Sequence, residues 1–380
     1  MLKTVEFMKN NSNWRELLVQ APYCLHINED DNYVIFKYDQ IDSDFNEDIC
    51  RECRGLVIDK NKLEPVALSF YKFFNVQETF ADKIDWDSAK VLEKVDGSKM
   101  MVWWDTYSSQ WRISTSSQLD AKNAPVGDFG ISFQDLFDRA LHNYTFPDYV
   151  TLYDYLQKGF CYTFELVTPE SRVVVPYKKD ALYLIGVRDV ESFEELDPMS
   201  IELSKFVKVP KQFNLANLKD CLNKVEHMGY NEEGFVVVDK NWKRIKIKSP
   251  AYVAAHYLKN NGVNSKYRML RIIEKGEKSE FLGYFPEYTQ YMEEIEQKRN
   301  RVLERIKEGV YSLVQSTYFD TFETRKEAAQ YITKHYSDIS GILFKYLDTN
   351  LVEYFAQSEW NKLSKEKKMA LLGYKLEKEE

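Results

Sequence analysis

The segment around Lys94 has residue types and spacing that suit nucleophilic chemistry. A strand-like run ends at Glu93 and Lys94, a tight turn follows at Asp96 and Gly97, and a second strand-like run begins after it. An ordinary lysine, with a pKa of about 10.4, is almost fully protonated near neutral pH, so a reactive lysine needs a desolvated, cationic pocket. The motif alone is weak, because an ordinary hairpin turn with an exposed lysine would have the same residues.

Several other short segments carry charged residues that would fit the same site. These residues are Arg54 at the start of a strand-like run, Lys72 between aromatic residues, Glu165 and Glu233 amid apolar neighbours, and Lys246 and Lys248 in the run KRIKIKS. Lys246 and Lys248 are two residues apart in a strand, so their side chains point to the same side. Each residue alone has a structural interpretation, as a buried paired carboxylate or as part of a solvated basic face. Their joint occurrence in this order favours one catalytic site.

This ordered set resembles the covalent nucleotidyltransferase superfamily of polynucleotide ligases and capping enzymes, and within it the T-even phage RNA ligase 1 family. The similarity runs from Arg54 to about Tyr257, through the runs ECRG, KFFN, K-x-DGS, FE-x-V-x-P-x-x-R, EGF-V and KIKS. The resemblance implies that Lys94 attacks the α-phosphate of ATP to form lysyl-AMP. AMP then moves to an RNA 5′-phosphate, and an RNA 3′-hydroxyl seals the phosphodiester and frees AMP. Such catalysis depends on positioning and on neutralising phosphate charge.

The resemblance also implies roles for the charged residues. Lys246 and Lys248 would cover the α-phosphate and the departing AMP. Arg54 and Lys72 would bind ribose or phosphate oxygens of the nucleotide or of the RNA end. Glu165 would hold the ribose hydroxyls.

The remaining implied roles concern the metal and the base. Glu233 would hold Mg²⁺, or Mn²⁺ in its place, through water, with Glu165 as the second carboxylate near the metal. Glu93 belongs to the implied nucleotide site, and the glycines Gly97 and Gly234 would permit close approach of the backbone to the nucleotide. Ile185 and Val236 would sandwich adenine, although Val236 has an equally simple interpretation as a core residue.

The chain departs from the family pattern in the run ISTSSQ at 113–118. Ser116 stands where the resemblance predicts a lysine, which places one phosphate contact in doubt. Arg112 and Lys99 are the two candidates to replace it.

The spacing of apolar residues predicts an α+β domain of antiparallel sheets with flanking helices over residues 1–250, followed by an all-helical domain over residues 251–380. Helical spacing occurs at 132–143 and 214–228 in the first part, and over stretches such as 288–314 in the second. The predicted strands are 33–38, 55–59, 100–104, 110–115, 161–167, 181–187, 234–239 and 243–249. The resemblance makes the first domain an adenylyltransferase and the second a candidate for RNA or tRNA specificity.

Composition excludes several classes of protein. A net charge of −8 argues against a generally basic nucleic-acid coat but permits a local basic groove. No stretch of about 18 apolar residues could span a bilayer, and we expect a cytoplasmic protein with no membrane partner. The five scattered cysteines indicate reduced thiols, and the pair Cys50 and Cys53 lacks a second pair at zinc-finger spacing. Neither a P-loop nor a G-x-G-x-x-G fingerprint is present.

Three functions of different classes remain. The first is an ATP-dependent RNA ligase for RNA with 5′-phosphate and 3′-hydroxyl ends, such as cleaved tRNA, in RNA repair by a bacteriophage. The second is a DNA ligase or capping-type nucleotidyltransferase, which is disfavoured because such enzymes usually append an oligonucleotide-binding β-barrel where this chain becomes helical. The third is an inactive RNA-binding relative, which is disfavoured because the nucleophile, the carboxylates and the paired lysines are all present.

Overall fold

The computed structural model describes residues 1–127, 129–258, 266–318, 322, 324–349 and 355–374. The chain divides into two compact units, Met1–Asn260 and Asn261–Glu380. This division lies later than the predicted boundary at residue 250, because helix α6 (Pro250–Leu258) belongs to the first unit. Tyr252 and Val253 of α6 are buried, and the Tyr252 hydroxyl donates a hydrogen bond of 2.7 Å to Asp96 Oδ1.

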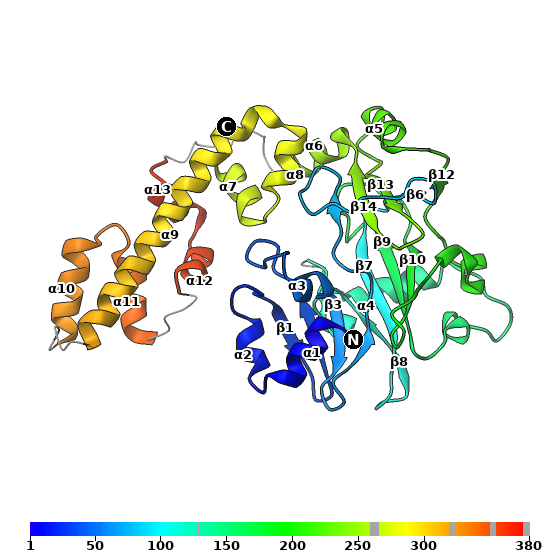
Figure 1. Ribbon diagram of the computed structural model, residues 1–380, viewed down its shortest axis with the longest axis horizontal. Helices are drawn as coiled ribbons and strands as arrows, with labels where there is room; N and C mark the ends of the chain where they lie inside the picture. Colours follow the sequence, from blue (N-terminus) through cyan, green and yellow to red (C-terminus); the bar gives the residue numbers. More distant parts are fainter. Residues whose placement is uncertain (128, 259–265, 319–321, 323, 350–354, 375–380) are drawn as a thin grey trace. The chain divides into compact units, whose positions relative to one another are not determined.

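Three sheets form the first unit (Figure 1). The N-terminal sheet has the strand order β1-β2-β3-β4, the central sheet β11-β10-β9-β7-β8 and the third sheet β12-β6-β13-β14-β5. The strands are β1 His26–Glu29, β2 Tyr33–Lys37, β3 Arg54–Asp59, β4 Glu64–Ala67, β5 Phe74–Asn75, β6 Lys90–Glu93, β7 Ser98–Asp105, β8 Gln110–Ser114, β9 Phe160–Val167, β10 Ala181–Asp189, β11 Glu195–Leu196, β12 Gln212–Phe213, β13 Gly234–Val238 and β14 Arg244–Lys248. Paired strands run antiparallel except β5 and β14, which are parallel. The predicted antiparallel α+β fold is confirmed.

Helices account for the rest of the regular structure. In the first unit they are α1 Lys3–Asn10, α2 Trp14–Leu18, α3 Asp48–Glu52, α4 Phe133–Leu141, α5 Leu218–Glu226 and α6, with 3₁₀ turns η1 Ala121–Asn123, η2 Leu152–Tyr155, η3 Pro198–Ser200 and η4 Glu202–Lys205. In the second unit they are α7 Lys266–Glu274, α8 Lys278–Tyr284, η5 Pro286–Tyr288, α9 Thr289–Tyr318, α10 Arg325–His335, α11 Ser340–Thr349, α12 Phe355–Lys362 and α13 Lys365–Leu371. The described part of this unit contains no strand, as predicted. None of the described helices has both the length and the apolar composition needed to cross a membrane.

The apolar cores are arranged in layers that leave one face of the third sheet uncovered by helix. Helices α1, α2 and α3 bury one face of the N-terminal sheet, through residues such as Trp14 and Phe36. Its other face packs on the central sheet around Tyr33 and Trp103. Helix α4 covers the outer face of the central sheet, and α5 covers one face of the third sheet around Phe235 (Figure 1). The opposite face of the third sheet is therefore available for a ligand.

The turn after Lys94 connects two different sheets rather than forming a hairpin. Strand β6 lies in the third sheet and β7 in the central sheet, so the chain crosses between sheets at Asp96 and Gly97. A Cβ atom at Gly97 would collide with the carbonyl oxygen of Leu166 on β9, so a side chain there would separate β7 from β9. Glycine is thus required for strand packing, and close approach of a nucleotide to Gly97 stays a prediction.

Buried Asp96 fixes this crossing. Its Oδ2 accepts hydrogen bonds of 2.8 and 2.7 Å from the amides of Val174 and Val175, and its Oδ1 accepts the Tyr252 hydroxyl. We expect Asp96→Ala to lower the free energy of unfolding by about 2–4 kcal/mol, because two buried amides lose their acceptor. Tyr252→Phe, which removes one donor and leaves both amides paired, is expected to cost about 1 kcal/mol. Urea unfolding of both variants checks this order, and equal losses would contradict it.

Candidate active site

A cavity of about 410 Å³ is lined by residues of the central and third sheets, by Arg54 at the start of β3, and by residues of neighbouring loops, among them Phe70 and Phe73 before β5. The predicted site residues that line it are Arg54, Glu93, Lys94, Glu165, Ile185, Val236, Lys246 and Lys248. The register of the third sheet explains part of this grouping. Leu92 on β6 lies beside Val236 on β13, which lies beside Lys246 on β14, so these three side chains share one face.

Lys94 directly follows β6 and contacts a buried carboxylate. Its Nζ lies 2.8 Å from Oε1 of Glu233, and the Lys248 Nζ lies 3.7 Å from the same oxygen. The Lys94 amide donates a hydrogen bond of 2.9 Å to the carbonyl of Gly234, which joins β6 to the start of β13. Gly234 has a φ of +131°, and a Cβ there would collide with the carbonyl of Ile247. This glycine therefore brings Glu233 close to Lys94.

Glu165 lies on β9 and lines the cavity, whereas Glu233 is not among the residues that line it. Its Oε1 accepts a hydrogen bond of 3.2 Å from the Gly97 amide. Burial raises the pKa of Glu165 to about 7; nearby Lys94 opposes this rise, and Glu233 adds to it. A carboxylate so placed can accept hydrogen bonds from sugar hydroxyls.

Lys246 is a buried amine among other cations. Burial is the main cause that lowers its pKa to about 7, and repulsion from Lys248 and Arg54 contributes next. An anion entering the cavity would remove this repulsion and favour the charged ammonium. The site is thus built for a ligand of negative charge.

The pKa of Lys246 has a consequence for stability that can be measured. Below about pH 7 the folded protein carries a buried Lys246 ammonium, which lowers the free energy of unfolding. This destabilisation decreases as the pH rises from about 7 towards 10.5, the pKa of lysine in the unfolded chain. We therefore expect Lys246→Met to raise the melting temperature of nucleotide-free protein more at about pH 6 than at about pH 9. Lys224→Met, on the exposed face of α5, is the control and should show no such difference. A larger gain at the higher pH would contradict the assignment.

Arg54 begins β3 with part of its guanidinium unsatisfied. Its Nη1 is buried and has no hydrogen-bond partner among the described residues. The guanidinium carbon lies 4.8 Å from the ring centre of Phe73 and 5.5 Å from that of Phe70. A buried guanidinium nitrogen without a partner costs free energy unless a ligand binds it, so Arg54 suits a phosphate or a carboxylate of a ligand.

Lys72 lies outside the residues that line this cavity. Its Nζ lies over the rings of Phe45, Tyr38 and Phe74, at 4.3, 4.4 and 5.2 Å from their centres, and donates a weak hydrogen bond of 3.3 Å to Gln40. Cation–π contacts therefore hold the ammonium in this conformation. A role for Lys72 at a phosphate stays a prediction and would require a change of rotamer.

The two residues predicted to sandwich adenine come from different sheets. Val236 lies on β13 of the third sheet, and Ile185 on β10 of the central sheet. The register of β10 with β9 shifts between Leu184 and Gly186, so Ile185 is the extra residue of a bulge. A bulge changes the direction of a side chain, and both residues line the cavity. Contact with adenine itself stays a prediction.

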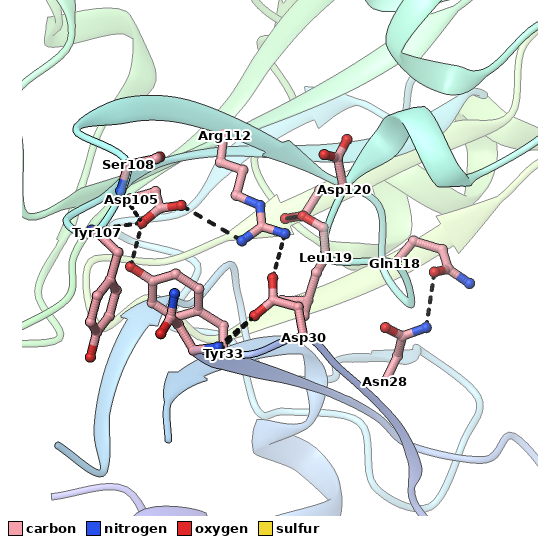
Figure 2. Close-up of polar contacts among 12 residues, drawn as sticks. Asn28, Asp30, Tyr33, Asp105, Tyr107, Ser108, Arg112, Gln118, Leu119 and Asp120 are labelled. Carbon is pink, nitrogen blue, oxygen red and sulfur yellow. Dashed lines mark hydrogen bonds and ion pairs between the residues drawn. The ribbon is translucent and has the colours of Figure 1, made fainter. Parts of the chain in front are cut away.

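Of the two residues that could replace the lysine expected at position 116, only one lies beside the cavity. Arg112 is held by Asp30 at 2.6 Å and Asp105 at 3.7 Å, in a network that joins β8 to the N-terminal sheet (Figure 2). Lys99 instead lines the cavity, and its Nζ donates hydrogen bonds to the Arg54 carbonyl and to Ser69 Oγ. Of the two, Lys99 is the residue placed beside the candidate site.

Sequence reasoning missed the ion pairs that join the sheets beside the cavity. Arg244 on β14 donates a hydrogen bond of 3.0 Å to Oε1 of Glu195 on β11, and Arg188 lies 3.7 Å from the same oxygen. Lys90 on β6 pairs with Asp197, which follows β11. Arg244 belongs to the run KRIKIKS, but its partner is far away in the sequence, so no local pattern could reveal the pair.

Glu165 in the cavity and neighbouring Glu233 suit a hydrated divalent ion better than a closed metal site. Among the described residues no group of three or more His, Cys, Asp or Glu side chains could hold a metal ion. Glu165 and Glu233 are near enough for Glu233 to raise the pKa of Glu165. Two carboxylates fit Mg²⁺ or Mn²⁺ when water and phosphate oxygens complete the coordination.

Comparisons with known proteins place the same residues in one family. The RNA ligase family model matches residues 52–252, which is more than half of the chain. An RNA ligase of Rhodothermus phage RM378 is 29% identical over 208 residues, which cover 45% of this chain and 46% of the phage protein. A protein of Autographa californica nuclear polyhedrosis virus, named for both polynucleotide kinase and RNA ligase, is 27% identical over 287 residues, covering 70% of this chain and 39% of the viral protein.

Two solved structures show weaker likeness. An archaeal ATP-dependent RNA ligase has a TM-score of 0.45 and 12% identity, over 77% of this chain and 78% of that chain. An RNA ligase of Naegleria gruberi with ATP and Mn has a TM-score of 0.35 and 18% identity, over 44% and 51%. The chain spans less than half the length of the two curated relatives. The family match covers the span that holds Arg54, Lys94, Glu165, Glu233 and both lysines of β14, and this chain belongs to the RNA ligase family.

Proposed function

We propose that this chain is an ATP-dependent RNA ligase that acts through lysyl-AMP on Lys94. The observation that carries the proposal is the convergence of Lys94, Lys246, Lys248 and Arg54 on one cavity that also holds Glu165. A folding core does not need four cations in one cavity, whereas a triphosphate does. Membership of the RNA ligase family also supports the joining of RNA ends as the reaction.

In the first step the Lys94 amine attacks the α-phosphorus of ATP, and pyrophosphate leaves from the opposite side. Lys94 must first give up a proton, and Glu233, 2.8 Å away, is the nearest base and keeps the amine oriented. Lys246 and Lys248 stabilise the charge that develops on the α-phosphate oxygens. Arg54, with its unpaired Nη1, holds a further phosphate oxygen.

In the second and third steps the same cations hold the phosphate that changes partners. AMP moves from Lys94 to the 5′-phosphate of RNA, and an RNA 3′-hydroxyl then displaces AMP. Glu165 accepts hydrogen bonds from the ribose of the nucleotide, while Ile185 and Val236 enclose the base. Glu233 and Glu165 would hold Mg²⁺ or Mn²⁺ through water, and that ion, when bound, neutralises phosphate charge.

The nature of the acceptor tests the substrate class. Full-length protein with ATP and Mg²⁺ is given, in separate reactions, single-stranded RNA with a 5′-phosphate and a 3′-hydroxyl, a broken tRNA anticodon stem-loop, and nicked duplex DNA. We expect circular or joined RNA and little sealing of the nick. Preferential sealing of nicked DNA would assign the protein to the DNA ligases instead. Faster sealing of the stem-loop than of the linear strand would support cleaved tRNA as the substrate.

A further inference from the structure

A second cavity, of about 400 Å³, lies where β8 stops following β7. Strand β8 pairs with β7 only from Met101 to Asp105, so it leaves the segment Ser98–Met100 uncovered on that side. The cavity is lined by this segment, by the loop of residues 115–118, and by Ala124, Pro125 and Phe133. We call it the hydroxyl cavity because serine and threonine side chains dominate its polar lining.

We call the cavity of about 410 Å³ at the candidate active site the nucleotide cavity. The hydroxyl cavity meets it at Lys99, which lines both cavities. Lys99 on β7 lies opposite Glu165 on β9, and its Nζ donates hydrogen bonds to the Arg54 carbonyl and to Ser69. A group bound in the hydroxyl cavity would therefore lie beside Lys99, which also lines the nucleotide cavity together with Arg54 and Glu165.

The hydroxyl cavity differs from the nucleotide cavity in charge. Among its lining residues Lys99 alone carries a charge, and none is a carboxylate. The hydroxyls of Ser98, Ser116 and Ser117 have no hydrogen-bond partner among the residues that the structure describes, so they are available to a ligand. A cavity lined mainly by hydroxyls, with one lysine and no carboxylate, suits a neutral polyhydroxyl group, whereas a 5′-phosphate suits the several cations of the nucleotide cavity.

The wall formed by residues 115–118 is already held in place. Asn28 Nδ2 donates a hydrogen bond of 3.0 Å to Gln118 Oε1, and Figure 2 shows Gln118 directed towards Asn28. Thr115 Oγ1 accepts the amides of Ser117 and Gln118 at 3.3 and 3.1 Å. Buried Ser114 donates to the Leu119 carbonyl at 2.8 Å. A fixed wall loses little entropy when a ligand binds.

We propose that the hydroxyl cavity binds the 3′-terminal ribose of the RNA acceptor and recognises its 2′-hydroxyl. The inference rests on the ligase function proposed above. The ribose O3′ forms a bond to the phosphorus of the adenylylated 5′ end, the bond from that phosphorus to the AMP oxygen breaks, AMP keeps the electron pair, and the proton of the 3′-hydroxyl passes to solvent. The 2′-hydroxyl, next to O3′ on the sugar, hydrogen-bonds Ser116 and Ser117.

The test separates the three steps with the full chain. Lysyl-AMP formation is measured with α-labelled ATP, AMP transfer with an RNA that has a 5′-phosphate and a blocked 3′ end, and sealing with a pre-adenylylated donor and a separate acceptor. Ser117→Leu fills the hydroxyl cavity, and we expect sealing to fall by about 10-fold or more, while the first two steps change less than about 2-fold. Ser108→Leu makes the same exchange at the exposed far end of the β7–β8 hairpin and should change no step.

A second pair of acceptors tests recognition of the 2′-hydroxyl. Wild-type protein should seal an acceptor that ends in ribose about 10-fold faster than one that ends in 2′-deoxyribose with its 3′-hydroxyl intact, and the double variant Ser116→Ala, Ser117→Ala should lose most of that preference. These alanines also serve if Ser117→Leu does not fold. An unchanged preference in the double variant, or equal loss of all three steps in Ser117→Leu, overturns the inference. Failure of wild-type protein to form lysyl-AMP or to seal RNA would instead refute the proposed ligase.

Discussion

Lys94→Met is expected to abolish RNA sealing with ATP while leaving measurable sealing of a donor that already carries AMP on its 5′-phosphate. Without the amine no lysyl-AMP can form, so the first two steps have no route. The third step needs only the cations and the acceptor hydroxyl, because AMP is already attached to the RNA. Methionine keeps the aliphatic stem of lysine. Lys248, whose Nζ lies 3.7 Å from Oε1 of Glu233, remains as a charged partner of that carboxylate.

The comparison is made by gel assay of both donors with the same enzyme preparation. Wild-type protein should use both donors. Loss of both activities in Lys94→Met, with the variant folded, would mean that Lys94 has another role. Sealing with ATP by this variant would show that Lys94 is not the nucleophile.

Lys246→Met and Lys248→Met are each expected to slow AMP transfer to RNA by about 100-fold or more, which is the usual loss when one group that stabilises a developing phosphate charge is removed. Both lysines line the cavity from β14, and Lys246 lies near enough to Lys248, Arg54 and Lys94 for their charges to lower its pKa. Single-turnover rates measured from preformed lysyl-AMP isolate this step from ATP binding.

The exposed lysine of α5 provides the matched control for these variants. Lys224→Met makes the same chemical exchange on the covered side of the third sheet and should change the rate by less than about 2-fold, as surface substitutions away from a site usually do. Rates near the wild-type value in both β14 variants would refute their assignment to the phosphate. A large loss in Lys224→Met would point to an unspecific effect of charge.

The longer strands were predictable because each carries its own signal, whereas the short strands β1, β4, β5, β11 and β12 were not predicted. The runs 161–167 and 181–187 are rich in apolar and aromatic residues, and in the structure they lie within β9 and β10 of the central sheet. The alternation of lysine and isoleucine in 243–249 predicted that Lys246 and Lys248 share one side, and both line the cavity from β14 while Ile245 and Ile247 are buried. Local periodicity is enough for such features.

Other parts of the site depend on contacts that a local pattern does not contain. The turn at Asp96 has the residues of a hairpin, yet it joins two sheets, because β6 pairs with β13 and β7 pairs with β9. The choice between Arg112 and Lys99 was likewise open in the sequence. That choice depends on the positions of Asp30, which pairs with Arg112, and of Arg54, whose carbonyl accepts a hydrogen bond from Lys99. Asp30 lies between β1 and β2, and Arg54 begins β3.

The boundary between the two units shows the same limit. Residue 250 is where the sequence changes from strand to helix patterns, and this change predicts a domain boundary there. Helix α6 follows that point but stays in the first unit, because Tyr252 is buried there and bonds Asp96. A change in secondary structure is therefore not the same as a change of domain.

The most direct test of the central claim is to find where AMP becomes attached. Wild-type protein is incubated with α-labelled ATP and Mg²⁺, digested under conditions that preserve a phosphoramide, and mapped by mass spectrometry. The account predicts one AMP on the peptide that contains Lys94, released as RNA with a 5′-phosphate is added. Absence of AMP from the protein, or its attachment to a different lysine, would contradict the account.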